Sequence, residues 1–262
     1  AFSLHVFFLH RLNVWIDQRT KDWFLAGSPF PIVGIIICYL ALVYVIVPSY
    51  MRDRKPYDLR KLLLAYNVFQ VVVCYFLIRQ LVRHGWTFRY LYTCELADYS
   101  NSKNAIGFLH AAYLNYCVKT AELVETVLFA LRKKRSQISF LHVYHHVFTY
   151  LLAWIFAKYV GAYQEMSIMV LNSIVHMIMY SYYFLSSFKP CQSFTSRIKP
   201  IITIIQLAQL VTMLVHVYAA LQPSCAANKT IYTLHAVNLV ILISLFTNFY
   251  IQTYVRNARK LK

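Results

Sequence analysis

Seven stretches of this chain approach the length and apolar character that a helix needs to cross a lipid bilayer. Such a helix requires about 20 mainly apolar residues. The third, fourth and fifth stretches are more polar than lipid-facing helices, so we expect them to line an interior cavity. The sequence therefore predicts an all-α polytopic membrane protein, with residues 1–262 as one domain. The predicted spans lie near residues 30–50, 62–82, 108–131, 138–158, 163–187, 200–221 and 231–255.

The composition disfavours other classes of protein. Hydrophobic residues make up 60% of the 262 residues and charged residues only 13%, whereas soluble domains usually contain about 25% charged residues. Five glycines are too few for a Gly-rich nucleotide loop. The net charge of +17 comes from short basic clusters between apolar stretches, which is typical of membrane topology and anionic ligands rather than of nucleic-acid binding. Polar residues interrupt residues 1–29, so we expect no cleavable signal peptide there.

The distribution of Lys and Arg predicts an orientation. One set of connecting segments, with the C-terminal end, carries sixteen basic residues, whereas the opposite set carries at most nine. Cytosolic loops are enriched in Lys and Arg, so the N-terminus should be lumenal and the C-terminus cytosolic. Cys94 and Cys225 then share the lumenal side, where oxidising conditions permit a disulfide, and Asn228 begins a glycosylation sequon there. Residues 259–262 loosely resemble a retrieval signal of the endoplasmic reticulum.

Three histidines occupy one turn of the fourth predicted span. His142, His145 and His146 are three and four residues apart, so their rings share one helical face. Packing alone explains three imidazoles on a buried helix poorly. Histidine pairs at this spacing can bind zinc or iron, but the additional histidine clusters of membrane di-iron enzymes are missing from the sequence. The remaining interpretation is acid, base or nucleophilic chemistry by imidazole without a metal or other cofactor.

Polar side chains at helical spacing also mark three neighbouring spans. On the third, Lys119 and Glu122 form either an intrahelical ion pair or a site that orients an imidazole and binds an anion. On the fifth, Asn172 and His176 form either a polar seam between helices or an oxyanion donor with a second imidazole. Other polar residues extend these faces and could bind an amide chain or bridge helices: Tyr180, Tyr183, Thr203, Gln206 and Gln209.

Taken in order, these motifs resemble the fatty acid elongases of very-long-chain synthesis. The chain has Lys-x-x-Glu-x-x-Glu-Thr at 119–126, His-x-x-His-His at 142–146, Asn-x-x-x-His-x-x-Met-Tyr-x-Tyr-Tyr at 172–183 and Thr-x-x-Gln-x-x-Gln at 203–209. One residue departs from the family pattern, because Glu125 stands where the family usually has Asp. Shorter matching segments extend the resemblance over nearly the whole chain: 17–23, 98–100 and 131–134.

The resemblance implies a 3-oxoacyl-CoA synthase of the endoplasmic reticulum that condenses a long-chain acyl-CoA with malonyl-CoA. It implies seven transmembrane helices, six of them in an inverted barrel around a closed-end tunnel. By analogy, His145 attacks the acyl thioester in a ping-pong reaction, while the other three histidines and Asn172 stabilise the oxyanion. The expected partners are membrane lipid, a second copy of the chain and the other elongation enzymes. A basic ring should bind coenzyme A: Arg132, Lys133, Lys134, Lys199 and Arg256.

Two other functions compete with this interpretation. A membrane iron oxygenase or desaturase is also a histidine-rich lipid enzyme, and stoichiometric iron would favour it. A seven-span receptor or transporter is the second, but the chain has neither an Asp-Arg-Tyr nor an Asn-Pro-x-x-Tyr signature where receptors carry them.

Overall fold

The computed structural model describes residues 17–94, 98–159 and 163–256, and this part of the chain contains helices and no β-strand. The predictions for residues 1–16 and for the C-terminal residues 259–262 concern positions outside the described residues. The long helices are α2 (Pro29–Ala41), α4 (Arg60–Arg83), α5 (Lys103–Leu131), α6 (Phe140–Tyr159), α7 (Tyr163–Ser186), α8 (Gln192–Leu221) and α9 (Lys229–Tyr250). A π-helical turn (Leu42–Ile46) joins α2 to α3 (Val47–Tyr50), and a second (Ile251–Arg256) extends α9.

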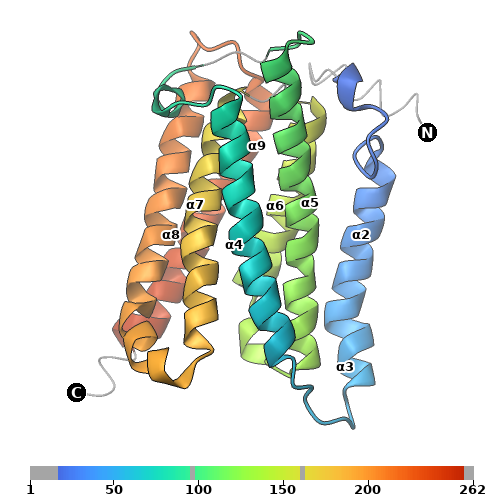
Figure 1. The fold of residues 1–262 in the computed structure, drawn as a ribbon, viewed down its shortest axis with the longest axis vertical. Coiled ribbons are helices and arrows are strands. Elements are labelled where there is room, and N and C mark those ends of the chain that lie inside the picture. Colours follow the sequence, from blue (N-terminus) through green and yellow to red (C-terminus); the bar gives the residue numbers. More distant parts are fainter. Residues whose placement is uncertain (1–16, 95–97, 160–162, 257–262) are drawn as a thin grey trace.

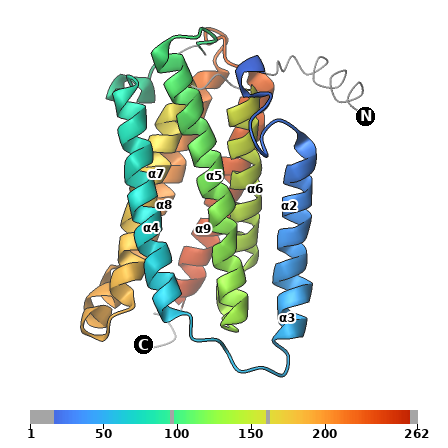
Figure 2. The same ribbon diagram turned by 45° about the vertical axis from the view of Figure 1, so that its right-hand side comes forward.

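Helices α4 to α9 run side by side in one bundle, and α2 lies on its flank beside α5 (Figures 1 and 2). Each of the seven predicted spans corresponds to a helix, and six segments are long and apolar enough to cross a membrane. The helix that does not meet this criterion is α5, whose buried residues include the charged side chains Lys119, Glu122 and Glu125. The all-α membrane class is therefore confirmed, while the count of seven spans and the inverted barrel stay predictions.

The helix ends follow from local sequence. Ser28, Ser102 and Asn228 each precede a helix and accept a hydrogen bond from a backbone N–H of its first turn. Such caps satisfy donors that have no partner within the helix. Apolar side chains on the outer faces of α2 and α4 remain exposed, which suits contact with lipid rather than water.

The flanking helix is tied to the bundle by polar contacts at both ends. Near its start, the backbone carbonyl of Ala26 accepts hydrogen bonds from Trp154 Nε1 at 3.0 Å and from Lys158 Nζ at 3.3 Å. Near its C-terminal end, the Tyr39 hydroxyl donates to Thr126 Oγ1 at 2.9 Å. These contacts fix α2 against α5 and α6, so a residue of α2 reaches the neighbourhood of the histidine turn.

The two ends of the bundle differ. One end holds the connections 51–59, 132–139 and 187–191 together with the last described residues (Figure 1). We call it the basic end because these segments carry more Lys and Arg than the described connections at the opposite end. At the opposite end, a disulfide joins Cys94 to Cys225, with their Cα atoms 5.7 Å apart. We call this the disulfide end. These are the two cysteines for which the sequence predicts a bridge.

Candidate active site

A cavity of about 650 Å³ runs inside the bundle, from the basic end toward the disulfide end. Side chains of α5, α6, α7, α8 and α9 line it. Near the basic end it is lined by polar residues such as Ser139 and Lys199, and deeper down by Leu152, Met169 and Leu210. A cavity that is polar at one end and mainly apolar below suits an amphipathic ligand with a long apolar part.

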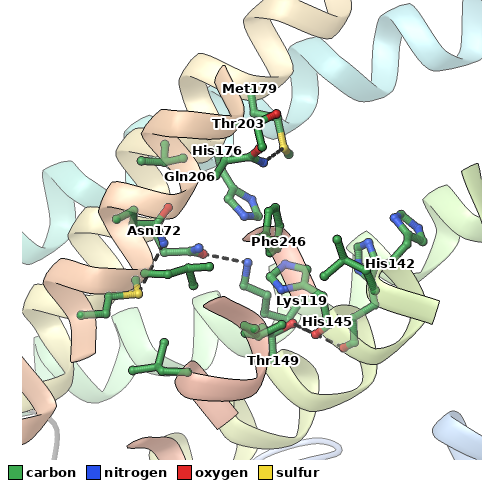
Figure 3. A pocket seen from close by; sticks show the side chains of 18 of the residues that line it. Lys119, His142, His145, Thr149, Asn172, His176, Met179, Thr203, Gln206 and Phe246 are labelled. Atoms are coloured by element: carbon green, nitrogen blue, oxygen red, sulfur yellow. Dashed lines mark hydrogen bonds between the residues drawn. The ribbon is translucent and has the colours of Figure 1, made fainter. Parts of the chain in front are cut away.

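The histidine turn lies at the start of α6, next to the basic end, and all three of its rings line this cavity. The ring centroids of His142 and His146 are 4.3 Å apart, and those of His145 and His146 are 5.6 Å apart. The Phe246 ring of α9 meets the His145 ring edge-on, with centroids 6.4 Å apart (Figure 3). Helical spacing alone therefore predicted correctly that the three imidazoles share one face.

Two of these imidazoles have an unused polar atom. Nδ1 of His145 and Nδ1 of His146 are buried, and within the described segments neither has a hydrogen-bond partner. An unsatisfied buried donor or acceptor is costly. A ligand in the cavity could supply the missing partner.

A charged network crosses from α5 to α7 beside the histidines. Lys119 Nζ donates to both carboxylate oxygens of Glu122, at 2.8 and 3.0 Å. It also donates to Oδ1 of Asn172 at 2.9 Å (Figure 3). Nδ1 of His176 lies 3.2 Å from Oε1 of Glu122. Lys119, Asn172 and His176 line the cavity, whereas Glu122 is fully buried behind them. Glu122 is thus placed to orient Lys119 and His176 rather than to contact a ligand.

His142 is held by a separate chain of hydrogen bonds. Its Nε2 lies 2.9 Å from Oγ1 of Thr126, which also accepts the hydrogen bond from Tyr39. Because Thr126 accepts from Tyr39, its own hydroxyl proton is available to His142 Nε2. This arrangement favours the neutral tautomer of His142 that carries its proton on Nδ1.

The aromatic and amide residues predicted from the sequence also reach the cavity. Tyr180 and Tyr183 line it from α7, and the Tyr180 hydroxyl donates to Glu125 at 3.5 Å. From α8, Gln206 donates to the sulfur of Met179 at 3.3 Å, and Gln209 to the sulfur of Met213 at 3.4 Å. Sulfur is a weak acceptor, so both amides retain capacity for a ligand.

Of the side chains predicted to form a basic ring for coenzyme A, only one lies at the described cavity. Lys199 lines the cavity near its basic end, but Arg132 does not. Lys133 donates to the backbone carbonyl of Arg52 at 3.3 Å, and Arg256 to Gln252 at 3.1 Å. Of the five predicted cations, Lys199 alone lines the described cavity.

Sequence reasoning missed a polar group at the deep end of the cavity: Glu165, His235 and Asn238. The available signal was a carboxylate near the start of the fifth predicted span and two polar residues three positions apart, on one helical face, in the seventh. Among the residues with described positions, no three His, Cys, Asp or Glu side chains are arranged to hold a metal ion. The prediction of chemistry without a metal or other cofactor stays a prediction.

Comparison with known proteins identifies the family. The sequence profile of the GNS1/SUR4 (ELO) family matches residues 24–262. The chain is 37% identical to the very long chain fatty acid elongase 4 of Homo sapiens over 238 residues, which are 91% of this chain and 76% of that protein. It is 33% identical to elongase 1 of Mus musculus (95% of this chain, 90% of that one) and 32% identical to elongase 7 of Rattus norvegicus (94% and 89%). The chain therefore belongs to the GNS1/SUR4 family and is a membrane protein of fatty acid elongation.

Proposed function

We propose that this protein is the condensing enzyme of elongation, a 3-oxoacyl-CoA synthase that joins a long-chain acyl-CoA to malonyl-CoA. The observation that carries the proposal is that His142, His145 and His146 face the same cavity as Lys119 and Asn172. Imidazoles supply a nucleophile and proton carriers, the Asn172 amide supplies an oxyanion donor, and the Lys119 ammonium supplies a nearby positive charge. The apolar part of the cavity accepts the acyl chain.

The first half-reaction transfers the acyl group to the enzyme. An unprotonated ring nitrogen of His145 attacks the thioester carbonyl, the C–S bond breaks, and coenzyme A leaves as the thiol after taking the proton that the imidazole releases. The product is an acyl-imidazole on His145. The neighbouring imidazole of His146 is placed to carry this proton, because the two ring centroids are 5.6 Å apart.

The second half-reaction forms the carbon–carbon bond. Malonyl-CoA loses carbon dioxide, and the electron pair of the broken C–C bond becomes the enolate of the thioester. The enolate carbon attacks the acyl carbonyl, His145 is released, and 3-oxoacyl-CoA forms with the net uptake of one proton. His176 and Asn172 line the cavity and can hydrogen-bond the negative oxygen of either step. The three N–H groups of Lys119 already donate to Glu122 and Asn172, so Lys119 contributes its positive charge.

The covalent step is tested by mass spectrometry. Purified protein incubated with acyl-CoA but without malonyl-CoA should gain the mass of one acyl group, which maps to His145 and disappears when malonyl-CoA is added. His145→Ala should remove the adduct and lower the turnover by about 10²–10⁴-fold. His110→Ala, which changes an exposed histidine stacked on Trp23, is the matched control and should retain both. Product formation with sequential kinetics and no adduct would refute the acyl-imidazole but not the condensation.

The proposed setting is the endoplasmic reticulum membrane, with the basic end of the bundle in the cytosol. Coenzyme A thioesters would then enter from the side of Lys199. Partners would be the reductases and dehydratase of the elongation cycle and a second copy of the chain. Asn228 is partly exposed at the disulfide end, so in this orientation a glycosidase should lower the mass of the protein. Thr230→Ala should abolish that mass change, and modification engineered at the basic end instead would reverse the proposed orientation.

A further inference from the structure

A second group of polar side chains lies at the far end of the cavity, away from the histidine turn. Glu165 comes from α7, and His235 and Asn238 come from α9. All three line the cavity, although they are 2%, 5% and 3% exposed respectively. The mechanism above uses none of them. Their neighbours include Tyr232, whose hydroxyl is also buried.

These groups lack the partners that buried polar atoms normally have. Within the described residues, Oε1 of Glu165, Nδ1 of His235 and Oδ1 of Asn238 have no hydrogen-bond partner. Nδ1 of His235 lies 3.9 Å from Oε1 of Glu165, which is too far for a hydrogen bond. Such atoms at the end of an otherwise apolar pocket indicate that the missing partner belongs to a ligand.

The geometry of α6, α7 and α9 gives the distance from this group to the reaction centre. The His145 ring meets Phe246 at 6.4 Å, and the His235 ring meets Phe156 at 5.3 Å. These two contacts are eleven residues apart along α6 and eleven residues apart along α9, and Glu165 is eleven residues from His176 on α7. At a helical rise of about 1.5 Å per residue, the polar group therefore lies about 16 Å along the cavity from the histidines. An extended alkyl chain with bonds of about 1.5 Å covers that distance with roughly a dozen carbons.

We infer that the acyl substrate of this enzyme carries a hydroxyl group at or near the end of its chain, bound by Glu165, His235 and Asn238. This inference rests on the proposed function. A hydroxyl both donates and accepts, so it can donate to Glu165 or to Oδ1 of Asn238 while it accepts from His235. A terminal methyl group would leave these atoms without partners, and a terminal carboxylate, which only accepts hydrogen bonds, would leave Oδ1 of Asn238 without a donor.

The test compares the wild-type protein on matched pairs of acyl-CoA substrates, each pair with and without a terminal hydroxyl. Chain lengths should bracket a dozen carbons by about four on either side. At the matching length, the hydroxylated substrate should have a kcat/KM at least about tenfold higher, because its absence leaves buried polar groups unpaired. The preference should weaken at lengths that place the hydroxyl short of Glu165.

Variants at the polar group separate recognition from folding. Glu165→Leu combined with Asn238→Leu should reverse the preference in favour of the unsubstituted chain, and Glu165→Gln should retain part of it. Ser167→Ala is the matched control on the same helix, since Ser167 is buried but accepts a hydrogen bond from Trp86 rather than facing the cavity. It should leave the ratio of the two kcat/KM values unchanged.

Each outcome identifies which proposal fails. Equal use of both substrates by the wild type, or a preference for the unsubstituted or terminal-carboxylate chain, would overturn the inference, because water alone would then satisfy these atoms. Elongation of unsubstituted chains in the same experiment would leave the proposed function standing. Failure to elongate any acyl-CoA, with intact folding of the wild type, would overturn the proposed function itself.

Discussion

Lys119 Nζ on α5 lies 2.9 Å from Oδ1 of Asn172 on α7 while it also donates to both oxygens of Glu122. One ammonium group therefore links two helices and compensates a carboxylate that is fully buried. Breaking a buried ion pair on one side leaves an uncompensated charge, which is costly, whereas removing both charges is much less so. This asymmetry gives the first prediction.

Lys119→Met should lower the free energy of unfolding by about 3–5 kcal/mol, because Glu122 loses its cation. The double variant Lys119→Met/Glu122→Gln should recover more than half of that loss. Thermal unfolding of the detergent-solubilised variants measures both effects. Equal destabilisation by the single and double variants would mean that the pair does not act as a unit.

Thr126→Val should reduce kcat by about tenfold, because loss of one hydrogen bond to His142 Nε2 costs roughly 1–2 kcal/mol and frees the ring to change tautomer. Tyr39→Phe removes the hydrogen bond that directs the Thr126 proton but leaves the Thr126–His142 contact in place, so it should have the smaller effect, a change in kcat of less than about threefold. Steady-state kinetics of the two variants provides the comparison. A larger effect of Tyr39→Phe would argue against the tautomer role of Thr126.

Lys199→Ala should raise KM for acyl-CoA by about tenfold at low salt, because its charge lies at the cavity and attracts the phosphates of coenzyme A. The difference from wild type should shrink in about 0.5 M salt, where screening is strong. Arg132→Ala should change KM by less than about twofold, since this side chain does not line the cavity. Similar effects of the two changes would indicate that the whole basic end, rather than Lys199, attracts the substrate.

Cys94→Ser should destabilise the protein by about 4–5 kcal/mol, the value expected when a cross-link between residues 131 positions apart is lost. Reduction of the wild type should lower Tm to the same extent. Cys38→Ser, which changes an exposed free cysteine, is the control and should leave Tm unchanged. If reduction and Cys94→Ser differ, the variant has an effect beyond loss of the bridge.

Features that depend on position along one helix could be predicted from the sequence. The seven helices and the shared face of His142, His145 and His146 follow from hydropathy and helical periodicity. Features that depend on how separate helices meet could not. Nothing in the spacing shows that Lys199 faces the cavity while Arg132 does not. Glu165 and His235, seventy residues apart, approach each other only because α7 and α9 start at the same end of the bundle.

The bridge between Cys94 and Cys225 closes a covalent ring that contains α5, α6, α7 and α8. Every residue proposed to act on the thioester, from Lys119 to His176, lies inside that ring. During synthesis the ring cannot close until Cys225 has emerged and the hairpins before it have inserted. The oxidation state of these two sulfur atoms should therefore report when a newly made chain has finished building its reaction chamber.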